Sequence, residues 1–93
     1  MSKPRTIAVT WFREEDWPVW AAMDPLFDTS HARWLAKMNA QLPLIERRGI
    51  EVVKVEMDPN AFTAWAKASG KGHRQTDRAA YAAFVLMRRR TGH

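Results

Sequence analysis

Two stretches of the chain predict β-strands from the arrangement of their apolar residues. The first covers residues 6–12, where β-branched and aromatic side chains follow one another without glycine or proline. The second covers residues 50–57, where Val53, Val55 and Met57 share one face by the two-residue period of a strand. We expect the two strands to lie in one sheet.

Apolar residues at spacings of three and four predict two helices between these strands. The first is short, with Asp16 as its N-cap and Asp24 at its end. The second begins after Thr29 or Ser30 and continues to Arg48. Because proline removes a backbone donor and clashes with the preceding turn, Pro43 predicts a kink or a break at residues 40–42.

Two further helices are predicted after the second strand. Asp58 and Pro59 form a strong start signal, since the carboxylate caps the helix and proline occupies its first position. This helix closes at residues 69–70, and a last helix runs over residues 77–90 with Thr76 as its cap. The order strand–helix–helix–strand–helix–helix predicts an α/β fold, with a small two-stranded sheet covered by about four helices.

Two strands leave unpaired edges whether they run parallel or antiparallel. Pairing across a two-fold axis would complete a four-stranded sheet, so we expect a homodimer, formed through the sheet edge or through the aromatic surface.

Length and composition indicate one domain over residues 1–93, with flexible ends at residues 1–5 and 91–93. The chain has no cysteine, which excludes disulfides, thiolate metal sites and thiol nucleophiles. We find no signal-peptide pattern and no apolar run of the roughly 20 residues that a membrane span needs. These features favour a cytoplasmic protein without membrane contact.

The net charge of +5 is concentrated near the C-terminus. Residues 67–93 hold seven lysine or arginine residues and one acidic residue. Such clusters neutralise phosphates, which makes nucleic-acid binding one candidate function. It would use Lys71, Arg74, Arg78, Arg88, Arg89 and Arg90. The two groups lie at opposite ends of the last predicted helix, about 20 Å apart. They need not share a face, so a solvated tail or a protein contact stays open.

The tryptophans divide into two groups. Trp34 and Trp65 fall on predicted core-facing stripes, which indicates packing. Trp17 and Trp20 lie on the short helix between acidic turns, where partial exposure would suit a protein interface. Half-buried packing is the first interpretation for this pair, and a protein interface is the second.

Catalytic signals are sparse. Residues 14–16 are acidic and follow a strand end, where α/β folds often place ligand sites, and His31 begins the next helix. Three consecutive acidic residues point in different directions, and no histidine has a metal-ligand partner at helical spacing. No nucleophile elbow or phosphate loop is present. We expect no enzymatic activity, no cofactor and no metal, and a cleft at residues 14–16 and His31 ranks third among the candidates.

The segment from Val53 to Trp65, which contains D-P-x-x-F-x-x-W, leads through Gly70 to the run R-A-A-Y-A-A at residues 78–83. Together with Trp11-Phe12, and with Trp34-Leu35 before Gly49-Ile50, it resembles a family of small uncharacterised bacterial proteins. The resemblance covers roughly residues 6–84 and implies a compact bacterial cytoplasmic domain. It implies no catalytic or ligand-binding residue. The sequence therefore favours a non-enzymatic protein that binds another macromolecule, with nucleic-acid binding as the alternative.

Overall fold

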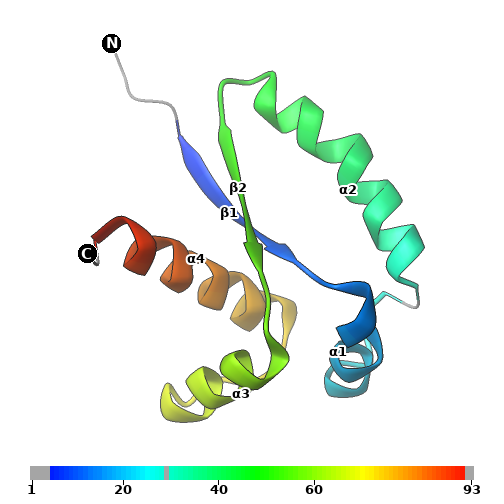
Figure 1. Cartoon of the computed structure of the whole chain (residues 1–93), viewed down its shortest axis with the longest axis vertical. Coiled ribbons are helices and arrows are strands. Elements are labelled where there is room, and N and C mark those ends of the chain that lie inside the picture. The colour runs from blue at the N-terminus through cyan, green and yellow to red at the C-terminus, as the bar shows by residue number, and fades with distance from the viewer. Residues whose placement is uncertain (1–4, 29, 92–93) are drawn as a thin grey trace.

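The computed structural model describes residues 5–28 and 30–91 and shows a mixed α/β fold (Figure 1). The elements follow the predicted order, with a short 3₁₀ turn added after the first strand. They are β1 (Thr6–Trp11), η1 (Glu14–Asp16), α1 (Trp17–Met23), α2 (His31–Glu46), β2 (Glu51–Glu56), α3 (Pro59–Ala68) and α4 (Gln75–Thr91). None of the described helices is long and apolar enough to cross a lipid bilayer.

The two strands form a parallel pair, with Thr6 opposite Glu51 and Trp11 opposite Glu56. Parallel strands need a long connection, and α1 and α2 supply it. The strands lie between α2 on one side and α4 on the other, with α3 and α1 beyond their carboxyl ends (Figure 1). The sheet is therefore covered on both faces, while its two edges carry no further strand of the described chain.

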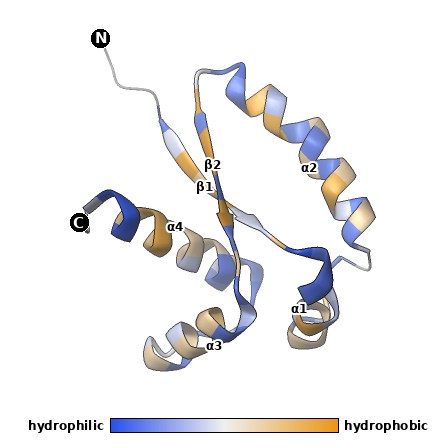
Figure 2. Ribbon diagram, viewed as in Figure 1, coloured by the Kyte–Doolittle hydropathy of each residue, from blue (hydrophilic) through white to orange (hydrophobic). Residues whose placement is uncertain are grey.

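Aromatic side chains fill the core below the carboxyl ends of the strands. Trp20 and Phe62 are fully buried, and their ring centroids lie 5.4 Å apart. Phe12 packs against Trp20 at 5.1 Å. Figure 2 shows apolar residues on both strands and a strongly hydrophilic last turn of α4. Helix α4 continues through Thr91.

The predicted N-cap residues are confirmed for α3 and α2 and are wrong for α4. The side chain of Asp58 accepts a hydrogen bond from the Asn60 backbone N–H, 3.0 Å away, as expected for an N-cap. Ser30 caps α2 in the same way through the Arg33 N–H, whereas Thr29 lies outside the described residues. At α4, Asp77 accepts from the Arg74 N–H, so the cap predicted for Thr76 is wrong.

Helix α2 is continuous through Pro43, so the predicted alternative of a break is wrong. The proline lies in the last turn, where the missing N–H costs one hydrogen bond and its own carbonyl still accepts from Arg47 at 3.0 Å. The helix ends at Glu46 rather than Arg48, and Gly49 adopts a positive φ of 82° in the turn that follows. Glycine suits this left-handed position because it has no Cβ.

Candidate functional site

Trp17 and Trp20 do not form an exposed interface. They are 7% and 0% exposed, because their spacing of three places both on the face of α1 that packs against the end of β1. The Trp17 Nε1–H donates to the Asp28 carbonyl at 3.1 Å. The Trp20 Nε1–H is buried with no acceptor among the described residues. The sequence-based proposal of a Trp17–Trp20 interface is therefore wrong, and both rings belong to the core.

Arg78 is also buried rather than available to a phosphate. Its Nη1 donates to the Asp24 carboxylate at 2.8 Å and to the His73 carbonyl at 2.7 Å. Its guanidinium lies 5.0 Å from the ring centre of Phe27. The ion pair joins α4 to the loop after α1, with both side chains about one-tenth exposed. We therefore remove Arg78 from the candidate nucleic-acid site.

The same contacts act on the Asp24 carboxyl. Its hydrogen bond from Arg78 lowers its pKa, and the backbone N–H of Leu26 at 2.9 Å lowers it further. The Asp24 carboxyl thus stays ionised at pH values below the usual pKa range of an aspartate. The pair holds the loop of residues 24–28 in place, and this loop ends the groove described below.

The remaining basic side chains form two separate groups. Lys71 and Arg74 precede α4 and are exposed, while residues 88–90 are exposed at its other end. A helix of 17 residues is about 25 Å long, so the groups lie at different places on the surface. Arg90 pairs with Glu51 at 2.8 Å. The Glu51 carboxyl accepts hydrogen bonds from the Thr6 hydroxyl and from Arg90, and both lower its pKa.

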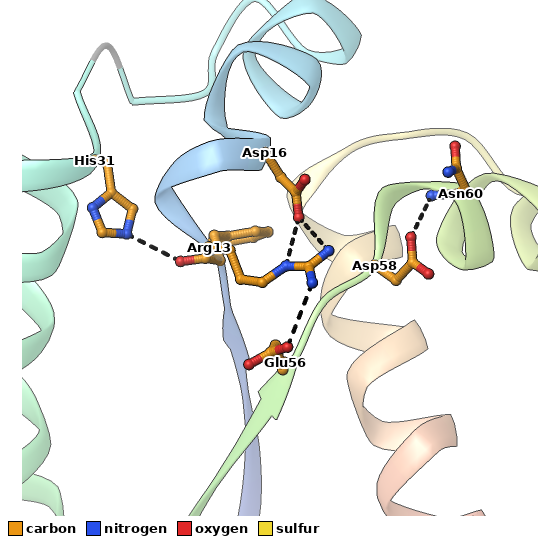
Figure 3. Close-up of polar contacts among 7 residues, drawn as sticks. Arg13, Asp16, His31, Glu56, Asp58 and Asn60 are labelled. Atoms are coloured by element: carbon orange, nitrogen blue, oxygen red, sulfur yellow. Dashed lines mark hydrogen bonds and ion pairs between the residues drawn. The ribbon is translucent and has the colours of Figure 1, made fainter.

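Polar residues at the carboxyl ends of the strands form contacts within the fold (Figure 3). Asp16 binds the Arg13 guanidinium at 2.6 Å, and Glu56 lies 3.8 Å from the same group. The hydrogen bond that the Arg13 guanidinium donates to Asp16 raises the pKa of Arg13. Glu14 and Glu15 point to solvent from η1.

His31 lies apart from this ion-pair group. Its Nε2 hydrogen-bonds the Phe12 carbonyl at 3.1 Å, and it points toward β1 from the side of α2 (Figure 3). The structure therefore does not bring His31 and Asp16 together around one cleft. Across residues 5–28 and 30–91, no group of three or more histidine or acidic residues is placed to hold a metal ion.

The open edge of β1 has backbone groups that are not used in contacts within the described fold. The carbonyls of Arg5 and Trp11 accept from β2, at 2.7 and 2.9 Å. Because strand residues alternate in direction, the backbone groups of Thr6, Ala8 and Thr10 point away from β2. No hydrogen bond from the described part of the chain reaches these outward groups. The next outward carbonyl, that of Phe12, is the one that His31 binds.

Two hollows follow this open edge. One of about 510 Å³ runs from Ala8 to Phe12 and is walled by residues of α2 and α4. Another of about 420 Å³ lies beside Thr6 and Ala8. On the α4 side the walls include Ala79, Ala83 and Met87, which are all exposed and recur every four residues. We call the outward groups of Thr6, Ala8 and Thr10, together with Ala79, Ala83 and Met87, the β1 edge.

The edge of β2 has a different chemistry. Glu51, Lys54 and Glu56 place charges along that strand, whereas β1 contains no charged residue and no proline. Natural proteins protect open edges with charges, prolines or bulges, and β1 has none of the first two. The sequence predicted an unpaired edge but did not show which strand would have apolar walls beside it.

Comparison of the chain with protein-family models, curated proteins and solved structures finds no match. The resemblance to a small bacterial family stays a prediction.

Proposed function

We propose that this is a non-enzymatic cytoplasmic interaction protein that binds other polypeptide through the β1 edge. The observation that carries the proposal is the row of outward backbone groups at Thr6, Ala8 and Thr10, which lies beside the exposed apolar side chains of Ala79, Ala83 and Met87 on α4. A strand added to such an edge gains main-chain hydrogen bonds, and the flanking walls select its side chains.

The groove defines the chemistry of the partner. Ala79, Ala83 and Met87 offer apolar surface, and the strand at its floor is uncharged. The matching segment is extended, free of charges at its centre, and composed of threonine and β-branched residues that suit a pleated surface. Its ends are not restricted by the edge itself.

An NMR titration tests this proposal. The probe is a synthetic peptide of alternating threonine and valine with lysines at both ends for solubility, and the control peptide has proline at alternate positions. We expect shift changes concentrated on the amides of Thr6, Ala8 and Thr10 with the first peptide only. No shift change at millimolar peptide, or changes spread over α3 instead, would overturn the proposal.

A variant sharpens the same titration. Ala8→Pro removes an N–H that points away from β2, so the ladder between the two strands stays intact. We expect the variant to fold, as judged by circular dichroism, and to lose peptide binding. Unchanged binding would contradict a main-chain contact at Ala8.

Nucleic-acid binding is the second candidate, and one arrangement favours it. The Arg88 guanidinium lies 5.7 Å from the ring centre of Phe84, which is 38% exposed, and Trp65 lies 5.9 Å from Phe84. Aromatic rings beside arginines are how single-strand binders hold bases and phosphates. This candidate keeps Lys71, Arg74, Arg88, Arg89 and Arg90 and loses Arg78.

Fluorescence anisotropy with mixed-sequence single-stranded DNA and RNA, at low and moderate salt, separates the two candidates. Nucleic-acid binding predicts affinity that falls steeply with salt and drops in the double variant Arg88→Gln, Arg89→Gln. The matched control is Arg33→Gln, an exposed arginine on α2. Absence of binding at low salt would eliminate this candidate.

A further inference from the structure

We infer that the strand which pairs with the β1 edge is β1 of a second copy, antiparallel about a two-fold axis at Ala8. This inference rests on the proposed function, because it names the partner of the same surface. It specifies a register, which a general tendency to associate would not.

The direction of the backbone groups limits the possible registers. In an antiparallel pair, residues that exchange both of their hydrogen bonds face each other directly. Within β1, these groups point outward at Thr6, Ala8 and Thr10. An axis at Ala8 pairs Ala8 with Ala8 of the second copy and Thr6 with Thr10, so that all three positions form hydrogen bonds between the strands.

The sequence of β1 is self-complementary about the same residue. Residues 6–10 read Thr-Ile-Ala-Val-Thr, which has nearly the same character in both directions. The axis therefore places threonine opposite threonine, and Ile7 opposite Val9. Such Thr–Thr and β-branched pairs are favourable across antiparallel strands. The segment also matches the uncharged partner strand that the groove requires.

The neighbouring registers each leave one of the three outward positions without a free partner in β1. An axis at Val9 would pair Thr6 with Phe12, whose outward carbonyl is already bound by His31 at 3.1 Å. An axis at Ile7 would leave Thr10 opposite a position before the start of β1 at Thr6. The axis at Ala8 keeps Thr6, Ala8 and Thr10 all opposite one another within β1.

Helix α4 supplies a second contact in this arrangement. The two-fold axis brings the α4 helices of both copies together, antiparallel, on the same side of the enlarged sheet. Ala79 and Ala83 are exposed one turn apart beside the strand edge, and small side chains allow helices to approach closely. The completed sheet has the order β2-β1-β1-β2, which leaves the charged strand β2 at both outer edges.

Disulfide trapping tests the register, because the chain has no cysteine of its own. Ile7 and Val9 would face each other as a non-hydrogen-bonded pair, with Cα atoms about 4.5 Å apart, within disulfide reach. We expect a mixture of Ile7→Cys and Val9→Cys proteins, oxidised with copper phenanthroline, to form cross-linked dimers. Each variant oxidised alone should give a yield of cross-linked dimer at least about fivefold lower. The two identical cysteines are then diagonal to each other across the strands rather than directly opposite.

The alternative outcomes are distinct. Efficient cross-linking of Val9→Cys alone would place the axis at Val9, and of Ile7→Cys alone at Ile7. Either result would overturn the register at Ala8. Equal, slow cross-linking in all three samples would indicate random collision and would overturn the symmetric pair altogether.

Sedimentation of the unmodified chain, from micromolar to millimolar concentration, tests the association itself. We expect a monomer–dimer equilibrium that Ala83→Glu weakens by about tenfold or more, since it places two carboxylates across the axis. The matched control Ala64→Glu changes an exposed alanine on α3 and should leave the equilibrium unchanged.

A monomer at all concentrations would overturn the inference. In that case, binding of the threonine–valine peptide to the β1 edge would still support the proposed function, and its absence would overturn both. A dimer that Ala83→Glu and Ala64→Glu weaken equally would place the contact elsewhere and would also overturn the inference.

Discussion

The outward backbone groups have hydrogen-bond partners at the carboxyl end of β1 and none in the described chain along the rest of the strand. At the carboxyl end, the outward carbonyl of Phe12 binds His31, and the Phe12 ring is surrounded by aromatic side chains. Along Thr6, Ala8 and Thr10, the outward groups receive no bond from the described chain, and the α4 side offers the apolar side chains of Ala79, Ala83 and Met87. One strand is thus closed by its own fold at one end and open along the rest. Under the proposed function, the open part is the surface that binds a second strand.

The largest expected effect concerns the closed end. Asp24→Asn leaves the Arg78 guanidinium buried without a counter-charge, so we expect the free energy of unfolding to fall by about 3–5 kcal/mol. Chemical denaturation measures this directly. The double variant Asp24→Leu, Arg78→Met removes both charges and should be much less destabilised than Asp24→Asn. If the two variants lose equal stability, the ion pair does not account for the effect.

The same pair predicts an acid dependence of stability. Since the folded-state pKa of Asp24 lies below its unfolded value, the stabilisation is complete above the unfolded pKa, near 4, and is lost as pH falls through the folded value. Glu51, whose pKa is lowered as well, acts in the same direction. Denaturation series at decreasing pH should therefore show a smaller loss for Asp24→Asn than for the unmodified chain. Parallel curves would contradict this assignment.

A smaller effect is expected at the boundary between the closed and open parts. His31→Ala removes the bond to the Phe12 carbonyl and ring contacts with Trp17 and Trp34, so we expect a loss of about 1–2 kcal/mol. His31→Gln keeps a donor and should recover part of it. Because the alanine variant frees the Phe12 carbonyl, it should also permit the axis at Val9, which Val9→Cys cross-linking would reveal. No new cross-link would mean that His31 does not limit the edge.

The smallest effect is expected on the open part itself. Met87 is 67% exposed, so Met87→Glu should change the unfolding free energy of the isolated copy by less than about 0.5 kcal/mol. The same variant should weaken association measurably at millimolar concentration. Thermal denaturation at low and high protein concentration separates these two quantities. A large loss of stability at low concentration would mean that Met87 supports the fold of the single copy.

Local signals in the sequence predicted most of the fold. The β-branched runs, the Asp58-Pro59 start and the helical spacing of apolar residues each depend on neighbours in the chain. They predicted both strands and the order of elements, which the structure confirms. The parallel direction was left open, because two strands with helices between them permit either pairing.

Long-range contacts explain what the sequence could not show. Arg78 looked like a surface cation because Asp24, its partner, lies 54 positions away. Trp17 and Trp20 looked partly accessible on a short polar-flanked helix, since the aromatic rings that bury them come from Phe12 after β1, from α2 and from α3. Likewise, the hollow beside β1 arises only when α2 and α4 are placed next to the strand.

Amide hydrogen exchange across β1, measured at micromolar and at millimolar protein, tests the central claim most directly. Ile7, Val9 and Trp11 turn their backbone groups toward β2, and we expect them to be protected at both concentrations. We predict that the amides of Thr6, Ala8 and Thr10 exchange rapidly in dilute solution and become protected at high concentration. If these three amides stay unprotected at high concentration while the other three are protected, the open edge does not bind a second strand of this chain.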